Sequence, residues 1–108
     1  VVLGAFAAHA LKNKVAPYYL EVFETAARYQ MYHAFALFLT AFLLRENQNF
    51  LLQLAAFLFC LGIFLFSGSL YALVFTKIKA WGAVSPLGGM CFILAWSLLA
   101  YSAVKLKS

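Results

Sequence analysis

The sequence predicts an all-α integral membrane protein, a bundle of four transmembrane helices that forms a single domain over residues 1–108. Three apolar runs are long enough to cross a bilayer, because about twenty apolar residues span its hydrocarbon core. They cover residues 26–44, 50–76 and 82–104, and polar residues crowd one end of each run. The composition agrees, since only 10% of the residues are charged, against about 25% in soluble domains.

A fourth apolar run, residues 1–11, has the length of half a crossing, because eleven helical residues rise about 16 Å. We therefore expect a first helix that is only partial here and whose beginning lies before Val1. The segment 11–16 is the predicted first loop, and Pro17 suits the first turn of the following helix.

The second helix is predicted to run unbroken from residue 17 to residue 44. Its start, residues 17–28, has one polar face that carries Glu21, Glu24, Thr25 and Arg28 at helical spacing. Glu24 and Arg28 are four residues apart, which allows an ion pair. We expect this segment to lie in the headgroup layer before the helix enters the bilayer.

The remaining loops are the short polar turn 45–49 and the segment 77–82. The net charge is +5, and the cations flank the apolar runs instead of forming a stripe. This distribution favours contacts with lipid headgroups and not with nucleic acid. Five cations fall at one end of the bundle (Lys12, Lys14, Arg28, Lys77, Lys79) and three at the other (Arg45, Lys105, Lys107), which predicts that the first end is cytoplasmic.

The hydrogen-bonding side chains inside the spans all fall in the half of the bilayer nearest the five cations. If helix direction alternates, this half contains His9, Tyr29, Gln30, His33, Ser67, Ser69, Tyr71 and Ser85. An unpaired polar group costs several kcal/mol in hydrocarbon, so these side chains are expected to face other helices. The sequence predicts that they line one polar cavity, with His9 and His33 in direct or water-bridged contact.

Several interpretations of this cluster remain open. Polar side chains that bond between helices are ordinary in membrane bundles, whereas ionisable residues in a membrane are also candidates for ligand binding or proton transfer. Two histidines at similar depth would permit haem ligation. No metal site is expected, because two histidines without a carboxylate fall short of a ligand set. Close helix packing is predicted at small residues, namely Gly4, Ala8, Gly68, Gly88 and Gly89.

No catalytic residues are predicted. The chain contains no Asp, and its three carboxylates, Glu21, Glu24 and Glu46, lie near the ends of the spans. A Ser-His-Asp set is therefore excluded, and no phosphate-binding loop is present. We expect a protein that is not an enzyme.

Four motifs follow one another along the chain: residues 4–11 (GAFAAHAL), residues 23–33 with Phe23-Glu24-Thr25-Ala26, Tyr29-Gln30 and His33, residues 66–71 (FSGSLY), and Pro86 with Gly88-Gly89. Together they resemble the YgdD/YwdK family, small bacterial inner-membrane proteins of uncharacterised function with a related transmembrane protein in animal mitochondria. The resemblance implies four transmembrane helices, and it implies no activity, substrate or cofactor. Ala7 departs from the Gly, and Ser85 from the Thr, that are common in the family.

Three functions are kept as hypotheses. The first is a non-enzymatic accessory or scaffold subunit of the inner membrane, which crosses it several times and packs against other membrane subunits or a second copy. The second is a small-molecule or ion-handling protein that uses the polar cavity. The third is a subunit that binds haem or quinone; no other cofactor is expected.

Overall fold

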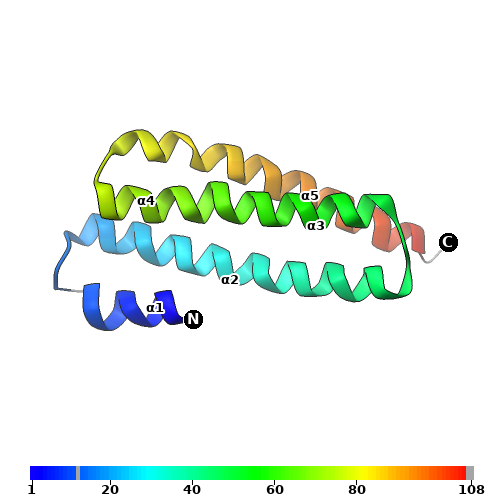
Figure 1. The fold of residues 1–108 in the computed structure, drawn as a ribbon, viewed down its shortest axis with the longest axis horizontal. Helices are drawn as coiled ribbons and strands as arrows, with labels where there is room; N and C mark the ends of the chain where they lie inside the picture. Colours follow the sequence, from blue (N-terminus) through cyan, green and yellow to red (C-terminus); the bar gives the residue numbers. More distant parts are fainter. Residues whose placement is uncertain (12, 107–108) are drawn as a thin grey trace.

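The computed structural model describes residues 1–11 and 13–106, and the regular structure of these residues is all helical. Lys12 and Lys107, which were counted for the orientation, lie outside the described residues. The chain forms four rods that alternate in direction (Figure 1). The molecule is elongated and thin, with principal extents of 52 × 26 × 15 Å.

The first rod is α1 (Val2–Phe6), which continues as the π-helical turn η1 (Ala7–Leu11). The second is the single long helix α2 (Pro17–Glu46). The third, here called the α3–α4 rod, consists of α3 (Phe50–Ile63), the π-helical turn η2 (Phe64–Gly68) and α4 (Ser69–Thr76). The fourth begins with the 3-10 turn η3 (Lys79–Ala83) and continues as α5 (Ser85–Leu106).

The ends of the helices follow from local chemistry. Ala16 is extended and Pro17 occupies the first turn of α2, where its fixed φ and missing N–H do no harm. The side chain of Asn49 caps α3 by accepting a hydrogen bond from the Leu51 N–H at 2.8 Å. Lys77 ends the α3–α4 rod in the left-handed conformation, with φ of 58°. The last helix was expected to start at residue 82. In the structure residues 79–83 form the 3-10 turn η3, and α5 begins at Ser85.

Each rod packs mainly on its neighbour in the chain, and α1 runs beside only the first half of α2 (Figure 1). One buried cluster lies between α2, α3 and α5 and includes Leu52, Phe59 and Leu99. A second cluster, which contains Ala7, Leu11, Phe23 and Val74, joins η1 to α2 and α4. The interior is thus divided into two parts along the length of the rods.

Two helices of the described residues are long and apolar enough to cross a membrane, Phe50–Thr76 and Lys79–Lys105. The helix α2 is longer than either, but Arg28, Gln30 and His33 make its first half more polar, and it is not one of the two. Large apolar side chains cover the outside of the molecule; for example, Phe38 is 74% exposed and Phe64 is 77% exposed.

Candidate functional site

His33 lies in the middle of α2 and is only 5% exposed. Its Nδ1 donates a hydrogen bond to the carbonyl oxygen of Tyr29 at 2.7 Å. Its Nε2 accepts a hydrogen bond from the indole Nε1–H of Trp96, on α5, at 3.1 Å. Because an indole N–H can only donate, the pair fixes the neutral imidazole with its proton on Nδ1. His33 therefore joins α2 to α5 through two fully used ring nitrogens.

Aromatic rings enclose this imidazole. The Phe92 ring of α5 stacks on it, with ring centroids 3.5 Å apart and an angle of 6° between the planes. Phe59 of α3 lies 5.9 Å away, and the Trp96 ring meets the imidazole edge-on at the same distance. A second proton on Nε2 would oppose the Trp96 N–H in these apolar surroundings. The geometry therefore suits a structural link between helices and leaves neither nitrogen free for a ligand.

Two further hydrogen bonds join the α3–α4 rod to α2. The buried Ser67 hydroxyl donates to the carbonyl oxygen of Ala26 at 2.8 Å. The Tyr71 hydroxyl donates to Oε1 of Gln30 at 2.6 Å. The cavity beside this second pair is a shallow groove of about 190 Å³, which Gly68 and Phe64 also line.

A third link joins the α3–α4 rod to α5 at the turn η2. The hydroxyl groups of Ser69 and Ser85 lie 2.7 Å apart, and the Ser85 hydroxyl also approaches the Phe66 carbonyl oxygen at 3.5 Å. Gly88 lies at the same level, where a Cβ would come within 2.3 Å of the Phe66 backbone nitrogen. The wide π-helical turn therefore lies where Gly88 allows the two helix backbones to approach closely.

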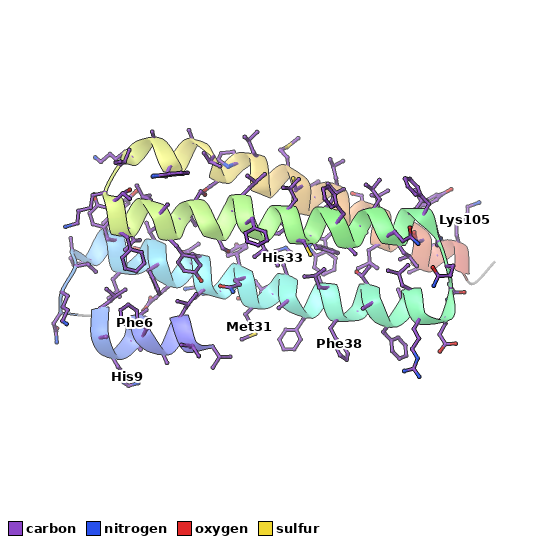
Figure 2. The ribbon with its side chains drawn as sticks, viewed as in Figure 1. Phe6, His9, Met31, His33, Phe38 and Lys105 are labelled. Carbon is purple, nitrogen blue, oxygen red and sulfur yellow. The ribbon has the colours of Figure 1, made fainter. Side chains whose placement is uncertain are left out.

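His9 is separate from these links. It is exposed on η1, and its side chain points away from the other rods (Figure 2). The expected contact between His9 and His33 is therefore wrong. The reason is the face that η1 buries: Ala7 and Leu11 pack against Phe23, and a residue two positions after Ala7 emerges on roughly the opposite side of a helix.

Of the eight residues predicted to line one cavity, Gln30, Ser67 and Tyr71 line the groove described above, and the others are distributed over separate contacts. The structure brings together Gln30 with Tyr71, Ser69 with Ser85, and His33 with the backbone of Tyr29. Ser67 bonds to Ala26 and His33 bonds also to Trp96, and both of these partners lie outside the predicted set. Tyr29 accepts the His33 bond through its backbone, while its ring is 38% exposed. Most of these hydroxyl and amide groups therefore hold helices together.

The glycines that pack closely also differ from the expected set. A Cβ on Gly4, Gly68 or Gly89 would meet nothing within 4 Å, and Ala8 is exposed. Gly88 is crowded, as described above, and so is Gly62, where a Cβ would come within 2.6 Å of the Phe92 ring. The sequence did carry a signal for Gly62, because the small residues Ala55 and Gly62 lie seven residues apart and so share one face of α3.

Phe92 and Trp96 were not recognised from the sequence as site residues. They lie four residues apart on the face of α5 that also carries Gly88 and Leu99. The sequence signal that could have identified them is the spacing of two aromatic residues at i and i+4, which places both on one face of the helix. In the part of the chain that the structure describes, no three His, Cys, Asp or Glu residues come together as a metal site.

The Ser67 bond provides a test of these links. Ser67→Ala removes a buried interhelix hydrogen bond and should destabilise the folded protein by about 1 kcal/mol. Ser97→Ala is the matched control, because the Ser97 hydroxyl is exposed and bonds only within its own helix, to the Ile93 carbonyl. Unfolding in mixed detergent micelles measures both changes. Equal stability of the two variants would contradict a structural role for Ser67.

A helical protein whose hydrogen-bonding side chains pair inside and whose outer faces are apolar is built for a lipid environment. These features define a helical membrane protein. A family model described as "Protein of unknown function (DUF423)" matches residues 3–89. The chain belongs to this family.

Curated relatives agree with the family assignment. The UPF0382 membrane protein YwdK of Bacillus subtilis is 46% identical over 95% of this chain and 85% of its own length. A UPF0382 membrane protein of Haemophilus influenzae is 41% identical over 100% of this chain and 86% of its own length. No solved structure matches the chain significantly. The resemblance to the YwdK family is thereby confirmed, and the chain is a membrane protein of a family without a known function.

Proposed function

We propose that this chain is a multi-pass protein of the bacterial inner membrane and that it acts as a non-enzymatic accessory subunit. In this proposal the second, third and fourth rods cross the membrane, and the first rod is part of a further crossing. The exposed aromatic and aliphatic side chains on α2, the α3–α4 rod and α5 support the first part. Phe35, Phe57 and Ile93, one on each of these rods, are all at least 60% exposed. Such surfaces are stable only in lipid or against another apolar surface.

The ends of the rods support the same arrangement. The turns between η1 and α2 and between α4 and η3 lie at one end of the bundle (Figure 1), and Lys14, Lys77 and Lys79 are in or beside these turns. Arg45 and Lys105 belong to the last turns of α2 and α5, at the other end. Cations that flank apolar spans interact with headgroups and determine orientation. In bacteria the spans of outer-membrane proteins are β-barrels, and the relatives named above are bacterial membrane proteins. A helical bundle of this kind therefore suits the inner membrane.

The accessory role is supported by the outer face of α2, which has an apolar hollow among the described residues. Most inward polar groups, in contrast, already have a partner within the bundle, the buried Ser102 hydroxyl being an exception. Met31, Ala34, Phe35 and Phe38 line this apolar cavity of about 390 Å³. Phe38 projects outward from α2 (Figure 2). A large apolar side chain from a helix of another subunit would fill the space between these rings.

Ala34→Trp should test this role, because it fills the hollow from a position that is exposed in the bundle. A photoreactive amino acid at Phe38 should form a defined crosslink to one membrane protein in living cells, and Ala34→Trp should remove most of this product. Ala100→Trp, on the exposed side of α5, is the control and should leave it unchanged. A lone monodisperse protein in mild detergent, with no crosslinked product, would contradict the accessory role.

A further inference from the structure

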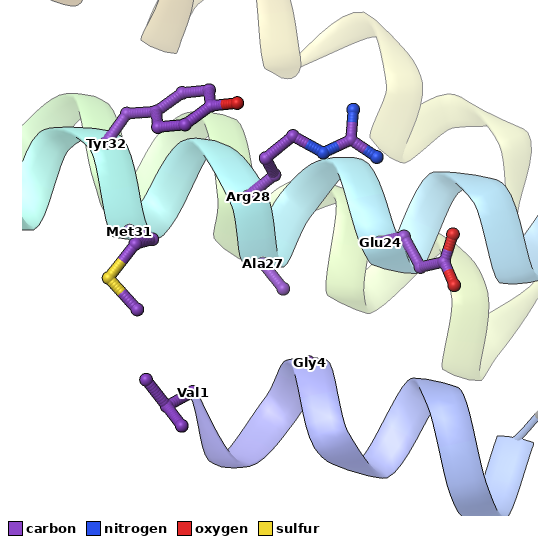
Figure 3. A pocket seen from close by; sticks show the side chains of 7 residues that line it. All are labelled: Val1, Gly4, Glu24, Ala27, Arg28, Met31 and Tyr32. Atoms are coloured by element: carbon purple, nitrogen blue, oxygen red, sulfur yellow. The ribbon is translucent and has the colours of Figure 1, made fainter.

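A cavity of about 350 Å³ lies between α1 and the first half of α2. Gly4 on α1 and Ala27 and Met31 on α2 line its apolar part. Val1 and Met31 face one another across the gap in Figure 3. Because a Cβ on Gly4 would meet nothing within 4 Å, the wall formed by α1 is open to an inserted chain.

The rim of this cavity carries three polar side chains on α2, namely Glu24, Arg28 and Tyr32. They follow one another at intervals of four residues, so each lies about 6 Å further along the helix than the last. All three are exposed. The expected ion pair between Glu24 and Arg28 does not form, and their charged groups extend to separate points in Figure 3. Both charges are therefore available to a ligand.

We propose that this cavity binds a phospholipid whose headgroup carries a primary ammonium, as in phosphatidylethanolamine. The proposal rests on the multi-pass arrangement inferred above. Arg28 would bind the phosphate through its guanidinium, and Glu24 would accept hydrogen bonds from the ammonium. The Tyr32 hydroxyl would donate to an ester carbonyl, and one acyl chain would lie along Ala27 and Met31.

The order of the groups along α2 supports this assignment. α2 begins at the end of the bundle that carries Lys14 and Lys77, so Glu24 lies nearest the membrane surface and Tyr32 lies deepest. A phospholipid presents its ammonium, phosphate and ester groups in the same order from water to hydrocarbon. A purely anionic headgroup would match Arg28 alone and would be repelled by the carboxylate of Glu24. A soluble phosphate compound would leave the apolar part of the cavity empty.

The test uses the full chain, reconstituted into vesicles of equal parts phosphatidylethanolamine, phosphatidylglycerol and phosphatidylcholine with identical acyl chains. Native mass spectrometry after extraction in mild detergent counts the lipids that stay bound. Phosphatidylethanolamine should be retained about fivefold more than phosphatidylcholine, whose methylated ammonium has no N–H to donate. Glu24→Gln should abolish this preference, and Arg28→Gln should reduce retention of all three lipids.

Arg45→Gln and Glu46→Gln are the matched controls, because they remove the same two charges at the opposite end of α2, outside the cavity. Circular dichroism and gel filtration establish that every variant folds. Glycerophosphoethanolamine, which has no acyl chains, should not displace the lipid. Displacement by it, preferential retention of phosphatidylglycerol, or equal retention of all three lipids would each overturn the proposal.

Alkaline carbonate extraction separates this failure from failure of the proposed membrane arrangement. If the chain resists extraction from the vesicles but shows no lipid preference, only the lipid site is wrong. If carbonate removes the chain from the vesicles, the multi-pass arrangement is wrong, and the lipid site is overturned with it.

Discussion

Gly88→Ala should destabilise the folded protein by about 3 kcal/mol, because the added methyl group has no space. A Cβ at this position would lie 2.3 Å from the backbone nitrogen and 2.8 Å from the Cα of Phe66. Backbone atoms cannot rotate out of the way as the end of a long side chain can. The α3–α4 rod and α5 would therefore have to separate, which would also stretch the bond between Ser69 and Ser85.

Gly89→Ala is the control for this change. It adds the same methyl group one position further along α5, where nothing lies within 4 Å, so its stability should stay within about 0.5 kcal/mol of the original. Reversible unfolding in mixed detergent micelles, followed by circular dichroism, measures both variants. Similar effects at the two positions would show that the close approach at Gly88 is not a determinant of stability.

His33→Ala should have a comparable effect, a loss of about 3 kcal/mol, for two reasons. The substitution leaves a void against the Phe92 ring, and it removes the acceptor of the Trp96 N–H. Tyr29 and Phe59 would also lose an aromatic neighbour. The near-ultraviolet circular dichroism of Trp96, recorded in a Trp81→Phe background, should weaken as the indole loses its fixed orientation.

A double-mutant cycle with Trp96→Phe isolates the hydrogen bond from the packing. Trp96→Phe removes the donor, and the coupling between the two substitutions should be about 1 kcal/mol. His33→Phe retains a ring over Phe92 and should lose less stability than His33→Ala. Strictly additive effects of His33→Ala and Trp96→Phe would contradict a direct bond between the two side chains.

The helices themselves could be predicted from the sequence, because apolar runs and polar loops alternate clearly along the chain. Pro17 marked the start of α2, whereas the turn predicted at residues 45–49 is shorter in the structure, because α2 continues through Arg45 to Glu46. The interruption at Ser67 and Gly68 was not predicted as a π-helical turn. The apolar run continues through that turn, and the turn lies beside Gly88 of α5, a contact that the sequence does not show.

The partners of the polar side chains were harder to predict, because a sequence gives the relative positions of residues on one helix but not the rotation of that helix against its neighbours. The depth of His9 suggested a contact with His33, yet η1 is rotated so that Ala7 packs inward. The indole of Trp96, which is 42% exposed, was not expected at His33. Both positions are fixed by packing between helices that are far apart in the sequence.

The π-helical turn between α3 and α4 has a consequence for every side chain after it. One extra residue in a turn sets the following residues back by about 100° around the helix axis relative to an unbroken α-helix. With this offset, Ser69 reaches α5 while Tyr71 reaches Gln30 on α2. A single rod can thus present matched donors to two different neighbours, and the phase of the whole downstream segment depends on five residues.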